Sequence, residues 1–232
     1  MLTLLTFPAN FGQFSVSSFC VKAALLLQVS GQKWQRQDMD DPRKMPFGKL
    51  PVLKTEQRLI ADSDAIADWL TKQGADFDAG LSDLDKARGR ALTRMAEEHM
   101  YFHMAYDRWC NDAVWPTVRN IYFDAIPRIL RKPITNGLRK NLMRGLNVLG
   151  LSRLSDDQRF ARLEQDLQVI TAHLNESPFL LGPTPSMADY SVAPVIAGLR
   201  TTPVQTRISQ RIENDQLLCD YLARLEAAVP LP

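Results

Sequence analysis

Apolar positions in the first 75 residues fall into short runs that are separated by turn residues. Four of these runs have the length and composition of β-strands, and a short polar turn joins the last two as a hairpin: Leu2–Phe7, Trp34–Met39, Val52–Lys54 and Arg58–Ala61. Two further segments are helical in pattern, one apolar on nearly every side and one with a single apolar face: Phe19–Val29 and Ser63–Lys72. The order of these elements, βαβ followed by ββα, predicts a small α/β domain over residues 1–75.

The rest of the chain is helical in pattern almost throughout. A segment rich in Asp and Gly, Gly74–Leu84, predicts a linker. Four long helices are predicted after it: Asp85–Asn111, Asp156–Asn175, Ser186–Leu199 and Asn214–Ala228. Three prolines indicate that helices between the first two must start, kink or end: Pro116, Pro127 and Pro133. Residues 85–232 are therefore predicted to form a second, all-helical domain.

Composition limits the class of protein. Of 232 residues, 45% are apolar and 23% are charged, which is typical of a soluble globular protein. No apolar run reaches the roughly 18 residues that a membrane span needs, and no basic residue precedes the first apolar run, so no signal peptide is predicted. Three widely spaced cysteines argue against a disulfide framework and favour a reducing, cytoplasmic compartment. A net charge of +2 gives no reason to expect a nucleic-acid partner.

Four short motifs stand where binding or catalysis is expected. Ser17–Cys20 lies where a loop gives way to the first helix, Gly48–Leu53 leads into the third strand, and Ala61–Ile66 opens the second helix. The fourth, Gly182–Asp189, contains a Ser-x-x-Asp spacing that predicts a helix capping box with a structural role.

In combination, these motifs resemble those of the cytosolic glutathione transferase superfamily, and the resemblance spans nearly the whole chain. The Gly-x-Leu-Pro-Val-Leu and Asp-Ser-x-Ala-Ile elements carry it. The first motif is also similar to that of the Fax/metaxin-like branch, where Ser-Pro-Phe-Cys-x-Lys is usual and where Ser18 here replaces the proline. The resemblance implies a thioredoxin-like α/β domain followed by an all-α domain, glutathione as co-substrate without a metal, and a homodimer.

The resemblance also implies which residues hold glutathione. Pro51 is expected to be a cis proline that presents the backbone of Leu50 to the cysteinyl part of the tripeptide, the alternative being an ordinary proline at a strand edge. Ser63, at a helix N-terminus, is expected to hold the γ-glutamyl carboxylate, and Asp62 the ammonium group. The family often has Glu or Gln in place of Asp62. The alternative is that either residue only caps the helix.

Ser17 is the candidate catalytic residue. A hydroxyl that donates to the glutathione sulfur, together with a helix N-terminus, stabilises the thiolate, because a thiol with a pKa near 8.5 is mostly protonated at neutral pH. No acidic residue precedes Asp38, so the start of this helix has no nearby carboxylate in sequence. The residues leave three alternatives for the sulfur contact, besides a purely capping role for Ser17: Ser15, Ser18 and Asn10.

Cys20 lies about one turn inside an apolar helix, where cysteine usually behaves as a small hydrophobic residue. If Ser17 rather than a thiol faces the sulfur, mixed-disulfide chemistry is disfavoured. Attack of the glutathione thiolate on an electrophilic carbon or a peroxide is favoured instead.

Two further features of the second domain are open to more than one interpretation. His99, His103 and Tyr106 share a helical face that predicts either the wall of the electrophile pocket between the domains or plain inter-domain packing; no third ligand indicates a metal site. Residues 128–153 contain seven basic residues and no acidic one, interleaved with leucines. This segment predicts a solvated face, a cationic lip of the substrate pocket or a contact with a membrane surface. Pro133 and several glycines argue against one continuous helix there.

The function predicted from the sequence is that of a glutathione transferase-like enzyme, which activates the glutathione thiol for attack on a small electrophile or peroxide. The alternative is a non-catalytic member of the same superfamily that acts through a partner or a membrane surface.

Overall fold

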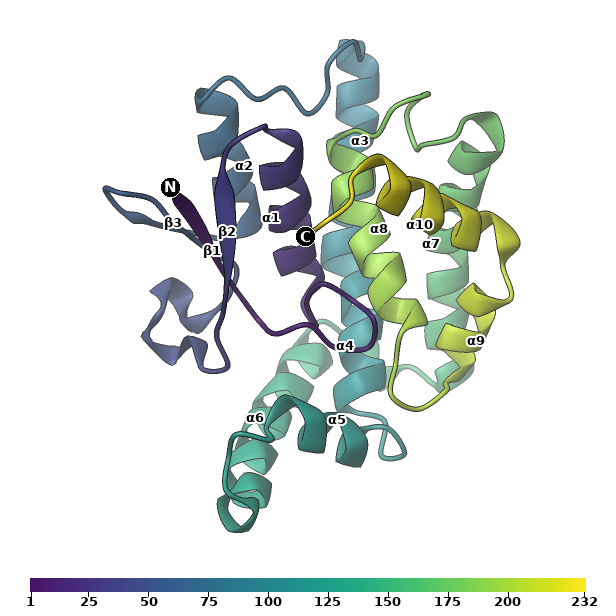
Figure 1. The fold of residues 1–232 in the computed structure, drawn as a ribbon. Helices are drawn as coiled ribbons and strands as arrows, with labels where there is room; N and C mark the ends of the chain where they lie inside the picture. Colours follow the sequence, from purple (N-terminus) through teal and green to yellow (C-terminus); the bar gives the residue numbers. More distant parts are fainter.

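The computed structural model describes residues 1–232. Its N-terminal domain is built on a mixed four-stranded sheet (Figure 1). Its strands run in the order β2-β1-β3-β4 and have these bounds: β1 Leu2–Thr6, β2 Trp34–Asp38, β3 Val52–Lys54 and β4 Leu59–Ala61. β1 and β2 are parallel, whereas β3 is antiparallel to both β1 and β4. This arrangement confirms the predicted α/β fold.

Helices α1 (Ser18–Val29) and α2 (Ser63–Lys72) lie between the sheet and the helical domain (Figure 1). α1 is buried almost throughout because its apolar residues occupy nearly every side, and it packs against α2 and against α8 of the second domain. Leu4 of the sheet, Leu26 of α1 and Ile66 of α2 belong to one hydrophobic core that continues into the helical domain. The apolar pattern of α1 therefore determines the junction between the two domains.

The second domain is all-helical, as predicted. Its helices are α3 Asp83–Met95, α4 Tyr101–Trp109, α5 Trp115–Tyr122, α6 Arg128–Val148, α7 Asp156–Glu176, α8 Met187–Arg200, α9 Arg207–Glu213 and α10 Gln216–Ala228. A π-helical turn, Ala96–Met100, joins α3 to α4, so the single long helix predicted here is continuous but locally widened.

Helix α8 lies at the centre of the molecule and is buried from Ala188 to Leu199. The predicted capping box starts it: the N–H and hydroxyl of Ser186 donate to a carboxylate oxygen of Asp189 at 2.9 and 2.8 Å. Asp189 also accepts hydrogen bonds from the Leu180 N–H and the Tyr221 hydroxyl, and burial raises its pKa. These contacts confirm the structural role of Asp189.

The expectation that Pro133 and the glycines interrupt the helix in this segment is wrong, because α6 is continuous over 21 residues. Pro133 and the glycines lie on exposed positions, whereas Thr135 and Leu146 are buried. Arg139 anchors the middle of the helix by donating to the carbonyls of Trp109 and Cys110 and to Asp112. These tertiary contacts offset the cost of Gly and Pro, about 1 and 3 kcal/mol per residue in a helix interior.

Candidate functional site

Three of the predicted motifs meet at one end of the sheet. The N–H of Asp62 donates to the carbonyl of Pro51 at 3.2 Å, and Val52 pairs with Ala61 in the β3–β4 ladder. Cys20, in the first turn of α1, packs in a small buried cluster with Leu50 and Val52. The start of α1, the Leu50–Pro51 segment and the start of α2 are therefore neighbours in space.

Ser17 is the N-cap of α1, and its hydroxyl oxygen accepts a long hydrogen bond from the Cys20 N–H at 3.4 Å. Within the chain its hydroxyl proton meets only the sulfur of Cys20, a weak acceptor, and the residue is only partly buried. No acidic residue lies in the first turn of α1. Ser17 thus has an O–H donor without a strong acceptor, beside an uncompensated helix N-terminus.

Two of the three alternatives to Ser17, namely Ser15 and Ser18, are buried. Ser18 is buried, and its hydroxyl donates to the carbonyl of Pro194 in α8 at 2.9 Å. Ser15 is also buried and accepts a hydrogen bond from the Ser17 N–H. The side-chain oxygen of Asn10 accepts from the Phe11 N–H at 2.9 Å, whereas its amide N–H groups have no partner within the chain, so the partly exposed Asn10 stays an alternative donor. Of the three serines, only Ser17 is partly exposed.

Cys20 is fully buried beneath this loop. Burial raises the pKa of its thiol, although a hydrogen bond from the Phe7 backbone and the neighbouring hydroxyls of Thr6 and Ser17 act in the opposite direction. A thiol of raised pKa is a poor nucleophile at neutral pH, which agrees with the predicted role of Cys20 as a packing residue.

Two arginines hold the loop that leads to Ser17. Arg36 donates to the carbonyl of Phe14 at 2.7 Å, and Arg108 donates to the carbonyl of Val16 at 3.1 Å. Arg108 is buried and forms no ion pair. Its two terminal nitrogens also bond the Tyr122 hydroxyl and the carbonyls at the end of α8 and just beyond it, whereas its Nε has no partner. A buried positive charge therefore stands close to the start of α1. Sequence reasoning missed Arg108, because nothing in the long helix marks which of its arginines turns inward.

The Leu50–Pro51 peptide bond is cis, as the resemblance implied. Leu50 is buried, yet neither its N–H nor its C=O forms a hydrogen bond within the chain. A free N–H and a free C=O on one residue can pair with the C=O and N–H of an extended peptide that lies beside it. The geometry supports a backbone contact at Leu50.

Asp62 and Ser63 open helix α2. One carboxylate oxygen of Asp62 caps the helix by accepting from the N–H groups of Asp64 and Ala65 at 2.8 and 3.3 Å, and the other oxygen has no partner within the chain. Ser63 is 2% exposed, and neither its hydroxyl nor its N–H bonds another group of the chain. The cap therefore leaves both residues with groups that a ligand can use.

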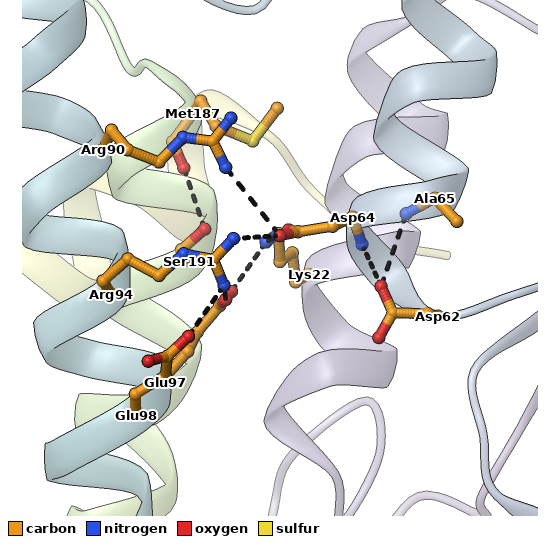
Figure 2. Close-up of polar contacts among 10 residues, drawn as sticks. All are labelled: Lys22, Asp62, Asp64, Ala65, Arg90, Arg94, Glu97, Glu98, Met187 and Ser191. Carbon is orange, nitrogen blue, oxygen red and sulfur yellow. Dashed lines mark hydrogen bonds and ion pairs between the residues drawn. The ribbon is translucent and has the colours of Figure 1, made fainter. Parts of the chain in front are cut away.

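An ion-pair network holds the first turn of α2 in place (Figure 2). Lys22 of α1 is 1% exposed, and its ammonium group lies 2.6 Å from carboxylate oxygens of both Asp64 and Glu97. Arg94 of α3 binds Asp64 from the outside at 3.0 Å. Burial raises the pKa of Glu97 in spite of Lys22, whereas Lys22 and Arg94 outweigh burial at Asp64 and lower its pKa. The signal for this network in the sequence is a lone lysine inside an otherwise apolar helix.

The prediction that His99, His103 and Tyr106 lie between the two domains is wrong. His99 bonds Asp166 of α7, and Arg159 of α7 lies over the Tyr106 ring, so this face packs inside the helical domain. His103 is buried on the same side, and its Nε2 atom has no partner.

The opposite face of the helix meets the N-terminal domain through Glu97, Tyr101 and Arg108, with the Tyr101 ring 4.9 Å from that of Phe19. Both faces mix aromatic and polar residues, so periodicity alone cannot assign them. No group of three or more His, Cys, Asp or Glu side chains is arranged to hold a metal ion.

Comparison with protein families agrees with this geometry. Residues 18–114 match the glutathione S-transferase N-terminal domain, and residues 132–218 match the glutathione S-transferase C-terminal domain. The chain belongs to the glutathione S-transferase superfamily. Solved structures of the superfamily share the fold over nearly their whole length. The glutathione transferase GSTFuA3 from Phanerochaete chrysosporium has a TM-score of 0.67 at 18% identity, covering 100% of this chain and 98% of that one. The β-etherase LigF from Sphingobium sp. strain SYK-6 has a TM-score of 0.68 at 17% identity, covering 97% and 95%.

Curated members of the superfamily are also similar in sequence. An isoprene-epoxide glutathione S-transferase of Rhodococcus sp. strain AD45 is 26% identical over 234 residues, which cover 97% of this chain and 98% of that protein. Human metaxin-2 is 20% identical over 183 residues, which cover 78% of this chain and 70% of metaxin-2. The second match supports the resemblance to the metaxin-like branch.

Proposed function

We propose that this protein binds reduced glutathione at the end of the sheet and activates its thiol for attack on a small electrophile. One observation carries the proposal: Ser17, Leu50, Asp62 and Ser63 leave polar groups without strong partners around neighbouring backbone segments. Membership of the glutathione S-transferase superfamily agrees with such a ligand.

The Ser17 hydroxyl donates a hydrogen bond to the glutathione sulfur in this proposal. The thiolate is favoured over the thiol by that donor, by the free N–H groups at the start of α1 and by the buried charge of Arg108. Ser17 forms no covalent bond with the substrate. Its role is to lower the pKa of the bound thiol.

Backbone groups of Leu50 and Ser63 and the carboxylate of Asp62 hold the rest of the tripeptide in this proposal. Leu50 pairs with the cysteinyl backbone through its free N–H and C=O. The N–H and hydroxyl of Ser63 bind the γ-glutamyl carboxylate at the positive end of α2, and the free oxygen of Asp62 binds the ammonium group. The cytoplasm, where reduced glutathione is abundant, and a homodimeric state are part of the same proposal.

The electrophile is a small molecule with a carbon that a thiolate can attack. The similarity to an isoprene-epoxide glutathione S-transferase favours an epoxide. In that reaction the sulfur–carbon bond forms as the carbon–oxygen bond of the ring breaks, and the released oxygen takes up a proton. A peroxide is the second candidate.

Titration calorimetry with reduced glutathione, followed by a conjugation assay with a generic aromatic electrophile and with a small epoxide, tests the proposal. We expect saturable heat and turnover with at least one electrophile. No heat at millimolar glutathione would contradict it and would favour the alternative of a non-catalytic member. Heat without turnover would support binding and exclude the enzyme with these substrates.

A further inference from the structure

Helix α6 extends away from the rest of the helical domain and packs against α4 and the turn at Leu151–Arg153 (Figure 1). Its outer surface carries an unusual number of exposed apolar side chains. Ile129 is 89% exposed and Val148 is 81% exposed. Leu130, Ile134 and Leu138 follow one another at intervals of four residues and form an exposed apolar stripe along the first half of the helix.

The same helix carries several cations and has no acidic neighbour in sequence. No Asp or Glu occurs between Asp124 and Asp156. Four basic residues on α6 are exposed and form no ion pair: Arg128, Lys132, Lys140 and Arg144. The other two on the helix, Arg131 and Arg139, are engaged with carbonyls of neighbouring loops and shape the fold instead.

The cations concentrate where α5 turns into α6. An open hollow of about 840 Å³ lies there, lined by Arg119, Arg128, Arg131 and Lys132 and by one carboxylate, Asp124. Ile129 and Leu130 stand on the same turn of the helix as two of these cations. The tip of α6 therefore combines several cations with two exposed apolar side chains.

We propose that this tip docks on the surface of an anionic lipid bilayer. The exposed cations at the hollow, Arg128 and Lys132, bind lipid phosphates, and the neighbouring Ile129 and Leu130 at the tip enter the boundary between headgroups and acyl chains. None of the proposed glutathione-binding residues lies on α6, so docking and glutathione binding are separable. No helix in the structure combines the length and hydropathy needed to cross a bilayer, and the contact proposed here is peripheral.

Charge favours a bilayer over the other occupants of such a face. Pairing with the same face of a second copy would place cations opposite cations. A nucleic acid offers phosphates but no apolar layer to receive Ile129 and Leu130. An anionic bilayer supplies both phosphates for the cations and an apolar layer beneath them for Ile129 and Leu130.

Co-sedimentation of the full-length protein with lipid vesicles tests the proposal. We expect binding to vesicles of phosphatidylcholine with phosphatidylglycerol, little binding to phosphatidylcholine alone, and weaker binding as salt rises. Each cation near an anionic surface contributes about fivefold in affinity, so R128Q/K132Q is expected to weaken binding about 25-fold. I129S/L130S is expected to weaken it as well, because a purely electrostatic contact would not respond to this change.

The matched control is L84S/K86Q, which removes an exposed leucine and an exposed lysine from α3 and is expected to bind vesicles like the parent. Circular dichroism and glutathione calorimetry confirm that the α6 variants remain folded. Four results would overturn the proposal: equal binding to neutral and anionic vesicles, no binding to either, full competition by soluble glycerol phosphate with no effect of I129S/L130S, or a dimer that I129S/L130S dissociates without changing vesicle binding. Stronger binding to DNA than to vesicles would overturn it as well.

Discussion

Lys22 of α1 and Glu97 of the helical domain form an ion pair of 2.6 Å across the junction of the two domains, and both side chains are buried. The same ammonium group binds Asp64 in the first turn of α2, next to the proposed glutathione-binding residues (Figure 2). One buried charge thus links domain packing to the position of the site.

We predict that Lys22→Met lowers the free energy of unfolding by about 3–5 kcal/mol, because it leaves the buried Glu97 with only the half-exposed Arg94, 4.0 Å away, as a partner. The double variant K22M/E97Q should recover part of this loss. Urea denaturation of the three proteins measures both effects. The control is Arg90→Met, since Arg90 is exposed and lies 3.9 Å from Asp64; its removal is expected to cost below about 1 kcal/mol. Equal costs for Lys22→Met and Arg90→Met would refute the interpretation.

Ser17→Ala is expected to lower turnover far more than it lowers glutathione binding. A hydrogen bond to a charged sulfur is worth about 1.5–3 kcal/mol, which corresponds to about 10- to 150-fold in rate. Steady-state kinetics measure turnover and the KM for glutathione. The ultraviolet absorbance of the bound thiolate as a function of pH measures the pKa of the bound thiol, which should rise in the variant.

Ser18→Ala is the matched control for Ser17→Ala, because the Ser18 hydroxyl donates to Pro194 and faces the helical domain. We expect it to reduce stability by about 1 kcal/mol without changing the pKa of the bound thiol. If only Cys20→Ala abolished activity, the proposed chemistry would be wrong.

Asp62→Asn separates the capping role of this residue from its proposed contact with the ammonium group. Asn retains a side-chain oxygen for the N–H groups of Asp64 and Ala65, and it tolerates the backbone φ of 84° at this position. We expect a near-normal melting temperature and a KM for glutathione raised about 3- to 10-fold, since a charge-assisted hydrogen bond becomes a neutral one. An unchanged KM would remove Asp62 from the site.

Protonation of His103 is expected to make stability fall in mild acid. Burial, with help from His99 and two arginines of α7, lowers the pKa of His103 from 6.5 to about 4. The unfolded chain therefore takes up a proton before the folded one does, and the folded state loses stability as the pH falls from about 6.5 to about 4. The loss is on the order of 3 kcal/mol over this window.

Chemical denaturation at several pH values measures this slope. His103→Phe should reduce it, because the variant has no titrating group at this position. His173→Gln, a change at a partly exposed histidine of α7, should leave the slope in place. A slope that is the same in His103→Phe as in the parent would assign the acid sensitivity to other groups.

Local features of the structure followed from the residues alone. The strands were located by their short apolar runs. The buried helix α1, the boundaries of α2 and the capping box at Ser186 depend on contacts within a few positions of the chain, where apolar spacing and capping chemistry act directly. Ser17, Leu50, Pro51, Asp62 and Ser63 were named from short motifs, and pairing of β3 with β4 brings most of them together.

Long-range packing decided the rest. Which face of the long helix meets the first domain depends on partners some 70 residues away, such as Lys22 for Glu97 and Asp166 for His99. Arg108 became part of the site, and α6 became one helix with an exposed apolar side, through contacts of the same kind. Periodicity shows that a face is apolar or mixed, but burial is a property of the folded chain, because it depends on what the other segments cover.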